Sequence, residues 1–231
     1  MGWALLDNYG NRKYLSSSER TRFFLAASKK SKKVELFCRI LLETGCRISE
    51  ALNLTLYKID LEEGVVIIRS LKKRNKICHR VIPISPDTMR LFKALMDEVA
   101  PEDYDERIWG WTRMTGYRHV CAVMDLAGIK GSQASPKGLR HGFAVAALEA
   151  GAPMNLVQRW LGHTHWSTTA IYADVIGPEE RGFAERLWLS AEAPRPVMRP
   201  SLRGKAGSKK VDQRENPCQK KRVLVAARLA R

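Results

Sequence analysis

The sequence has few acidic residues for its number of basic ones, no closely paired cysteines and no long apolar run. Its five cysteines form no Cys-x-x-Cys pair, so neither a zinc site nor a disulfide framework is indicated. A membrane-spanning helix needs about 20 consecutive apolar residues, which no segment supplies. The N-terminus lacks a charged and apolar signal pattern. We therefore expect an intracellular, cytoplasmic protein with reduced thiols and no membrane partner.

Motifs that hold metals or nucleotides are also missing. No Asp/Glu cluster and no His-x-x-x-His pattern suits Mg²⁺ or Zn²⁺, and no glycine-rich loop ends in Gly-Lys-Ser/Thr. We therefore predict no cofactor and expect chemistry that needs neither a metal nor ATP. If such chemistry is to keep the energy of a broken bond, the protein itself must supply the nucleophile.

What the sequence does have is positive charge. Its 40 Lys and Arg outnumber its 24 Asp and Glu, which gives a formal net charge of +16. Clustered cations gain free energy by releasing counterions from a polyanion, which favours double-stranded DNA as the partner; a merely soluble basic protein is the alternative. Residues 193–231 contain twelve basic and two acidic residues among Pro, Gly and Ser. We expect this segment to be a disordered basic tail.

Apolar periodicity predicts an α+β fold that is mainly α, with one β-hairpin. The hairpin strands are 65–69 and 80–84, and the basic tip between them would by itself be interpreted as a solvated turn. Ser16 and Glu19 form a capping box, and Gly45 is placed to end the second helix in the left-handed conformation. The predicted helices begin near Ser18, Val34, Ser49, Pro86, Tyr117, Pro136, Pro153, Thr168 and Pro178.

Residues suited to phosphate chemistry gather at three places along the chain. Paired guanidinium groups hold phosphate oxygens through charge-assisted bonds, and Arg47 and Arg140 are the best candidates for such a clamp. Tyr172 is the candidate nucleophile if neighbouring cations or a base activate it, although a tyrosine in a helix is more often structural. The full set is Arg47; then Lys137, Arg140 and His141; then His163, His165 and Tyr172.

In this order the motifs closely resemble those of the tyrosine recombinase (phage integrase) family. The intervals agree too, because 23 residues separate Arg140 from His163 and nine separate His163 from Tyr172. Four linked motifs in the right order are far more specific than any one, and the resemblance extends over about residues 13–189. The motifs are Thr44-Gly45-Cys46-Arg47-Ile48-Ser49-Glu50-Ala51-Leu52, Gly138-Leu139-Arg140-His141, Leu161-Gly162-His163 and Tyr172.

The resemblance implies a site-specific DNA recombinase. Arg47 and Arg140 would bind the scissile phosphate, with a hydrogen bond from His163. Tyr172 would attack the phosphate, giving a 3′-phosphotyrosyl enzyme and a free 5′-hydroxyl. The family's hairpin lysine, the general acid for the leaving 5′-oxygen, corresponds to Lys72 or Lys73; we favour Lys72 because it follows the strand directly. The residues predicted to contact DNA are Lys73, Arg74, Lys76, His141 and His165.

One departure from the family concerns Lys137. The family most often has His three positions before the second arginine, whereas this chain has Lys137, as some relatives and the similar type IB topoisomerases do. A lysine still donates to phosphate, so we keep Lys137 in the predicted catalytic set. It provides no base near neutral pH, which puts a proton-accepting role at this position in doubt.

The other departure concerns domain organisation. Typical relatives carry a helical core-binding domain ahead of the catalytic domain. Here we expect an N-terminal arm over 1–13, a catalytic domain over 14–192, a basic tail over 193–231 and no core-binding domain. The catalytic domain would then hold DNA alone, as in the small fimbrial-switch invertases, unless the tail, a partner or a part absent from this chain contributes.

The resemblance also implies assembly on DNA into a synaptic tetramer, with an accessory DNA-bending protein as a further partner. The helix predicted over 178–189 would dock on a neighbouring subunit or complete its own core. Such an enzyme would act at the nucleoid, in a bacterial, phage or plasmid context. Two alternatives stay open. One is a catalytically idle DNA-binding regulator, since 138–172 also resembles a helix–turn–helix; the other is type IB topoisomerase-like relaxation by a monomer.

Overall fold

The computed structural model describes residues 5–70, 78–172, 185, 187 and 188. Contacts divide the chain into two units, Met1–Trp188 and Leu189–Arg231, and the second lies outside the described residues. The predicted hairpin tip, the predicted tail and most of the helix predicted from Pro178 also fall outside them. No helix in the described ranges is both long and apolar enough to cross a membrane.

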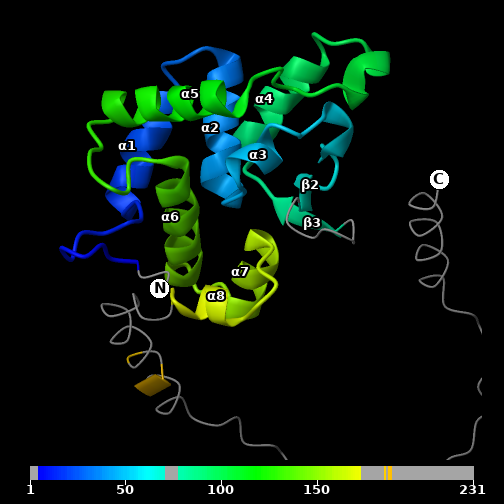
Figure 1. Cartoon of the computed structure of the whole chain (residues 1–231). Coiled ribbons are helices and arrows are strands. Elements are labelled where there is room, and N and C mark those ends of the chain that lie inside the picture. Colours follow the sequence, from blue (N-terminus) through cyan, green and yellow to red (C-terminus); the bar gives the residue numbers. More distant parts are fainter. Residues whose placement is uncertain (1–4, 71–77, 173–184, 186, 189–231) are drawn as a thin grey trace, which may run out of the picture. The chain divides into compact units, whose positions relative to one another are not determined.

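The first unit is mainly helical with one small sheet, as the sequence predicted (Figure 1). Its strands are β1 (Ile59–Asp60), β2 (Val65–Ser70) and β3 (Cys78–Pro83), and short 3-10 turns lie at Leu56–Lys58 and Pro101–Asp105. The helices are α1 (Ser17–Ala27), α2 (Lys32–Thr44), α3 (Ile48–Ala51), α4 (Pro86–Met96), α5 (Arg113–Leu126), α6 (Pro136–Glu149), α7 (Met154–Leu161) and α8 (Ser167–Ala170).

Helix boundaries follow the sequence signals where those are strong. Ser16 and Glu19 form the predicted capping box at α1. Ser135 caps α6 by accepting from the Gly138 amide at 3.2 Å, with Pro136 in the first turn. Gly45 ends α2 with φ 59°, the predicted left-handed conformation. These boundaries place Arg47 directly before α3 and Arg140 in the second turn of α6.

The helix predicted over 168–173 is shorter than expected. It begins after Trp166 rather than Ser167 and ends at Ala170, so Tyr172 lies beyond it, in a turn whose amide donates to the Thr169 carbonyl at 3.0 Å. The β-branched side chains of this stretch weaken helix propagation, which accounts for the early end. The prediction that Tyr172 sits in a helix was therefore wrong.

The sheet is antiparallel in the order β1-β2-β3, and the predicted hairpin is β2 with β3. Val66 pairs with Ile82 and Ile68 with Arg80, and all four side chains are buried. Because side chains alternate between the two faces of a strand, Arg80 shares the apolar inner face. The two-residue strand β1 was not predicted, since it is too short for an alternating pattern.

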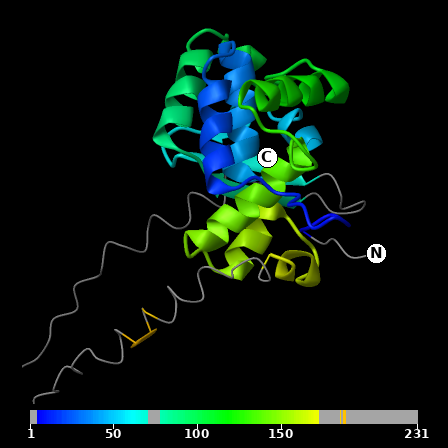
Figure 2. The same ribbon diagram turned by 90° about the vertical axis from the view of Figure 1, so that its left-hand side faces the viewer.

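Two apolar clusters form the core. The larger one, built mainly from α1–α5 and the sheet, contains Trp109, which is buried and donates from Nε1 to the Lys33 carbonyl at 2.8 Å. The smaller cluster contains Leu5 from the N-terminal arm and Tyr172. Helix α6 contributes Leu139 to the larger cluster and Phe143 to the smaller one. Figures 1 and 2 both show α6 running from the larger group of helices towards α7 and α8.

Candidate active site

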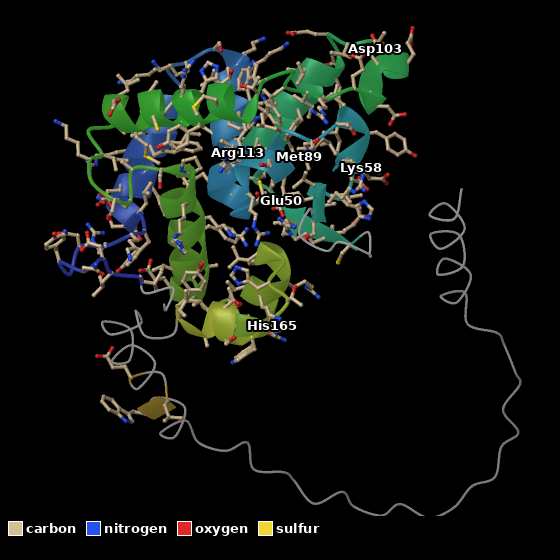
Figure 3. All side chains as sticks on the ribbon, in the orientation of Figure 1. Glu50, Lys58, Met89, Asp103, Arg113 and His165 are labelled. Carbon is tan, nitrogen blue, oxygen red and sulfur yellow. The ribbon has the colours of Figure 1, made fainter. Side chains whose placement is uncertain are left out.

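The predicted site residues that the structure describes all line one pocket of about 600 Å³. The pocket also has lining residues that the sequence did not indicate, among them Ser70, Arg113 and Tyr117. Figure 3 labels two lining residues from distant parts of the chain, Arg113 at the start of α5 and His165 after α7. The convergent predicted residues are Arg47, Lys137, Arg140, His141, His163, His165 and Tyr172. The predicted tip residues Lys72, Lys73, Arg74 and Lys76 lie outside the described residues.

Arg140 ties the ends of two helices together beside the pocket. Its Nη1 donates to the Gly45 carbonyl and its Nη2 to the Leu161 carbonyl, each at 2.7 Å. Burial, followed by repulsion from Arg47, lowers the pKa of Arg140 to about 10, so the group is still charged at neutral pH. A guanidinium group has more N–H donors than these two bonds use. Arg140 is thus held rigidly and retains donors for an anion.

Arg47 is fixed by Glu50. Arg47 donates from Nη1 to Glu50 Oε1 and from its backbone amide to Glu50 Oε2, each at 2.9 Å. Glu50 is buried, and its Oε2 also accepts from Arg80 Nη2. Burial by itself raises the pKa of Glu50, but the attraction and bonds of Arg80 and Arg47 outweigh it and hold that pKa below its usual value. One carboxylate therefore anchors two cations.

Arg80, which shares Glu50 with the pocket residue Arg47, is a further charged residue that sequence reasoning missed. It is only 5% exposed, and within the described residues its Nε and Nη1 have no hydrogen-bond acceptor. The alternation of β3 carried a signal, because it puts Arg80 on the same face as Ile82, where a charge needs a partner. With Arg47 and Arg140, Arg80 makes the buried surroundings of Glu50 strongly positive, which suits an anion in the pocket.

Tyr172 is held by His141. The Tyr172 hydroxyl lies 2.8 Å from His141 Nδ1, and both side chains are buried. Burial raises the pKa of Tyr172 to about 12, although Arg140 and Arg47 oppose the rise. Burial, with Lys137 and Arg140 nearby, lowers the pKa of His141 to about 4. Both groups are therefore uncharged at neutral pH. A DNA contact by His141 stays a prediction.

His163 also packs against Tyr172. The two rings stack with centroids 6.5 Å apart and planes 7° apart, and His163 Nδ1 lies 2.9 Å from Thr169 Oγ1. Burial, followed by the charges of Arg140 and Arg47, lowers the pKa of His163 to about 3. The neutral ring can donate a hydrogen bond from its other nitrogen. Lys137 and His165 are exposed at the rim of the same pocket.

Two motif glycines allow this convergence. A side chain on Gly45, which already needs its left-handed φ, would lie 2.4 Å from Phe143 Cδ1. A side chain on Gly138 would lie 1.9 Å from the Gln133 carbonyl oxygen, which leaves no room for a methyl group. The first glycine lets α2 end against α6, and the second lets the loop before α6 fold back over its first turn. The motif glycines thus set the approach of Arg47 to Arg140.

Across the described residues, no group of three or more His, Cys, Asp or Glu side chains is placed to hold a metal ion. The pocket instead offers cationic and neutral donors and several hydroxyl groups, among them the buried hydroxyl of Tyr172. Such an arrangement can bind an anion such as phosphate and bring the hydroxyl to it. No statement about the hairpin lysine follows from the described residues, since the tip lies outside them.

Comparison with curated proteins finds tyrosine recombinases. Tyrosine recombinase XerD of Yersinia pestis is 33% identical over 149 residues, which cover 59% of this chain and 48% of that protein. A probable integrase/recombinase protein of Methanocaldococcus jannaschii is 32% identical over 176 residues, which cover 70% of this chain and 49% of that protein. The chain thus spans about half the length of these relatives.

Solved structures share the fold. The crystal structure of XerA recombinase matches with a TM-score of 0.61 and 25% identity, covering 84% of this chain and 66% of that one. XerH site-specific recombinase bound to difH substrate matches with a TM-score of 0.61 and 21% identity, covering 79% of this chain and 59% of that one. The family model described as the phage integrase family matches residues 13–176, most of the chain. The chain therefore belongs to the phage integrase family.

Proposed function

We propose that this chain is the catalytic domain of a tyrosine recombinase that cleaves and rejoins double-stranded DNA at specific sites. The observation that carries the proposal is the convergence of Arg47, Arg140, His163 and Tyr172 on one positively charged pocket. The XerD relatives are tyrosine recombinases by name, and the similar XerH structure is bound to its difH substrate. Both support DNA as the substrate here.

In the proposed reaction, Arg47 and Arg140 hold the non-bridging oxygens of the scissile phosphate. Negative charge on these oxygens grows as the phosphorus becomes five-coordinate, so cations fixed beforehand stabilise the transition state more than the ground state. Glu50 and the two carbonyl bonds of Arg140 provide that fixation. His163 donates a further hydrogen bond to the phosphate.

The Tyr172 oxygen attacks phosphorus, which forms a 3′-phosphotyrosyl bond and breaks the bond to the 5′-oxygen. Lys72 gives the leaving 5′-oxygen its proton, and Lys137 donates to the phosphate from the rim. Rejoining reverses these steps with a 5′-hydroxyl from another strand, so bond energy is kept in the phosphotyrosyl linkage. We propose that the reaction uses neither a metal nor ATP.

Strand exchange between two sites requires several active sites in one complex. We propose that the protein assembles on DNA into a synaptic tetramer at the nucleoid, with an accessory DNA-bending protein where the site requires one. Residues 193–231 would add grip on DNA, because basic residues release counterions from phosphate. Lys73, Arg74, Lys76 and His165 would contact DNA around the catalytic pocket.

The test is a nicked suicide substrate whose short cleaved fragment diffuses away and traps the covalent adduct. The wild-type protein should yield a gel-shifted protein–DNA adduct without added metal or ATP. Tyr172→Phe should yield none while binding DNA nearly as well. If the wild-type protein binds the same DNA but forms no adduct, the enzyme proposal fails and the DNA-binding regulator replaces it. Relaxation of supercoiled DNA by the monomer without synapsis would favour the topoisomerase-like alternative.

A further inference from the structure

Within the reaction proposed above, on which this step rests, we propose that His141 is the catalytic residue that takes the proton from Tyr172. Its Nδ1 lies 2.8 Å from the Tyr172 hydroxyl, within the range in which a proton passes along a hydrogen bond. Both side chains are buried, His141 to 5% exposure and Tyr172 to 1%, so bulk water does not compete for this contact. His141 is the direct neighbour of Arg140 on α6, so one helix positions both the phosphate clamp and the proton acceptor.

The other polar groups around the phenol are less suited to this role. Lys137 in its charged form has no lone pair to receive a proton. His163 Nδ1 is engaged with Thr169 Oγ1 at 2.9 Å, and the ring stacks on Tyr172. Glu50 is engaged by Arg47 and Arg80. Of the described residues, His141 is the one whose basic atom touches the reacting oxygen.

The charge state of His141 suits an acceptor. Burial, followed by the charges of Lys137 and Arg140 on its own helix and of Lys13 from the N-terminal arm, lowers the pKa of His141 to about 4, so the ring is neutral near pH 7. Tyr172 and His163, the other titratable groups around it, are uncharged there as well. With the proton on Nε2, the lone pair of Nδ1 accepts the hydrogen bond from the phenol. A bound phosphate adds negative charge to the pocket, which favours the imidazolium and raises its basicity during the reaction.

The proton transfer to His141 accompanies the cleavage of the phosphodiester. As the Tyr172 oxygen bonds to phosphorus, its O–H bond breaks and the proton moves to His141 Nδ1. The bond from phosphorus to the 5′-oxygen breaks with both electrons going to oxygen, and Lys72 protonates that oxygen. In rejoining, His141 returns its proton to the phenol as it leaves phosphorus. A free phenolate, costly for a tyrosine whose pKa is about 12, is never required.

The test is His141→Asn, whose side-chain amide can keep a hydrogen bond to the phenol but cannot accept its proton. Single-turnover adduct formation on the suicide substrate, measured at saturating protein so that a change in DNA affinity does not enter the rate, should slow by about 10²- to 10⁴-fold near neutral pH. The variant's rate should then rise about tenfold per pH unit between about pH 7 and 9, because only ionised phenol attacks, while the wild-type rate should rise far less. His119→Asn, on α5 with its ring packed at a tilt against Trp111, is the matched control and should behave as wild type.

A His141→Asn rate within a few-fold of wild type, with the same pH profile, would overturn this assignment and leave the proposed function standing. Failure of the wild-type protein to form any adduct would instead overturn the proposed function. A 5′-bridging phosphorothiolate substrate separates the two proton transfers, because its thiolate leaving group needs no acid. This substrate should restore the cleavage rate of Lys72→Ala but not that of His141→Asn. If His141→Asn fails to fold by thermal melting, the same measurements are made on His141→Gln.

Discussion

The two apolar clusters differ in what they give the site. Beside the larger cluster, Glu50 fixes two cations, Arg47, which lines the pocket, and the buried Arg80. The smaller cluster contains the proposed nucleophile, because Tyr172 is one of its buried members. The two halves of the proposed chemistry therefore rest on separate packing, and the site is complete only while the two clusters keep their relative position.

Several of the contacts that hold the two clusters against each other involve motif residues. Arg140 reaches the Gly45 carbonyl at the end of α2 and the Leu161 carbonyl at the end of α7. Gly45 also lies against Phe143 of the smaller cluster. Arg140, the residue that we propose binds phosphate, therefore also joins the two apolar clusters. We call the contact of Gly45 with Phe143 the seam between the clusters. Substitutions in one cluster, at the seam or in helix α6 should change stability and activity to different extents.

The largest effect is expected where the larger cluster holds its buried charges. Glu50→Ala leaves Arg80 buried without its carboxylate, and breaking a buried pair from one side costs about 3–5 kcal/mol of unfolding free energy. Asp87→Ala is the control, because the Asp87–Arg90 pair is exposed and should change stability by about 1 kcal/mol or less. Urea unfolding followed by circular dichroism measures both. Equal, small losses would show that Arg80 finds another partner or water in the variant.

The next effect is expected at the seam. Gly45→Ala and Gly151→Ala each force a left-handed residue with a Cβ, at φ 59° and 83°, which costs about 1–2 kcal/mol. Only Gly45 has a neighbour in the way, with Phe143 Cδ1 2.4 Å from the new methyl group, whereas nothing lies within 4 Å at Gly151. Overpacking should add about 1–3 kcal/mol for Gly45→Ala. The difference between the urea midpoints of the two variants measures the cost of the contact with Phe143. Equal losses of stability would contradict the close approach of Gly45 to Phe143.

Sequence alone predicts the list of residues at this site better than their contacts. Strong local signals fix where Gly45 ends α2 and where Ser135 begins α6, so Arg47 and Arg140 fall at predictable points. The short turn at Tyr172 lacks such a signal, and there the predicted helix failed. The bonds of Arg80 to Glu50 and of His141 to Tyr172 join residues about thirty positions apart. No local pattern encodes them, because they depend on how whole elements pack.

The smallest effect is expected at the N-terminal cap of α6, the helix that joins the clusters. Ser135→Ala removes the side-chain bond to the Gly138 amide and should cost about 1 kcal/mol. Ser16→Ala, at the cap of α1, removes the equivalent bond to the Glu19 amide and should cost about the same.

The two cap variants should differ in activity, because the first two turns of α6 carry Lys137, Arg140 and His141, while α1 carries no residue of the pocket. Adduct formation on the suicide substrate should therefore slow for Ser135→Ala and stay near wild type for Ser16→Ala, at temperatures where both variants are folded. Equal rates would mean that the bonds of Arg140 to Gly45 and Leu161, rather than the start of α6, set the geometry of the clamp. The comparison thus separates the helix that carries the site from the bonds that join the clusters.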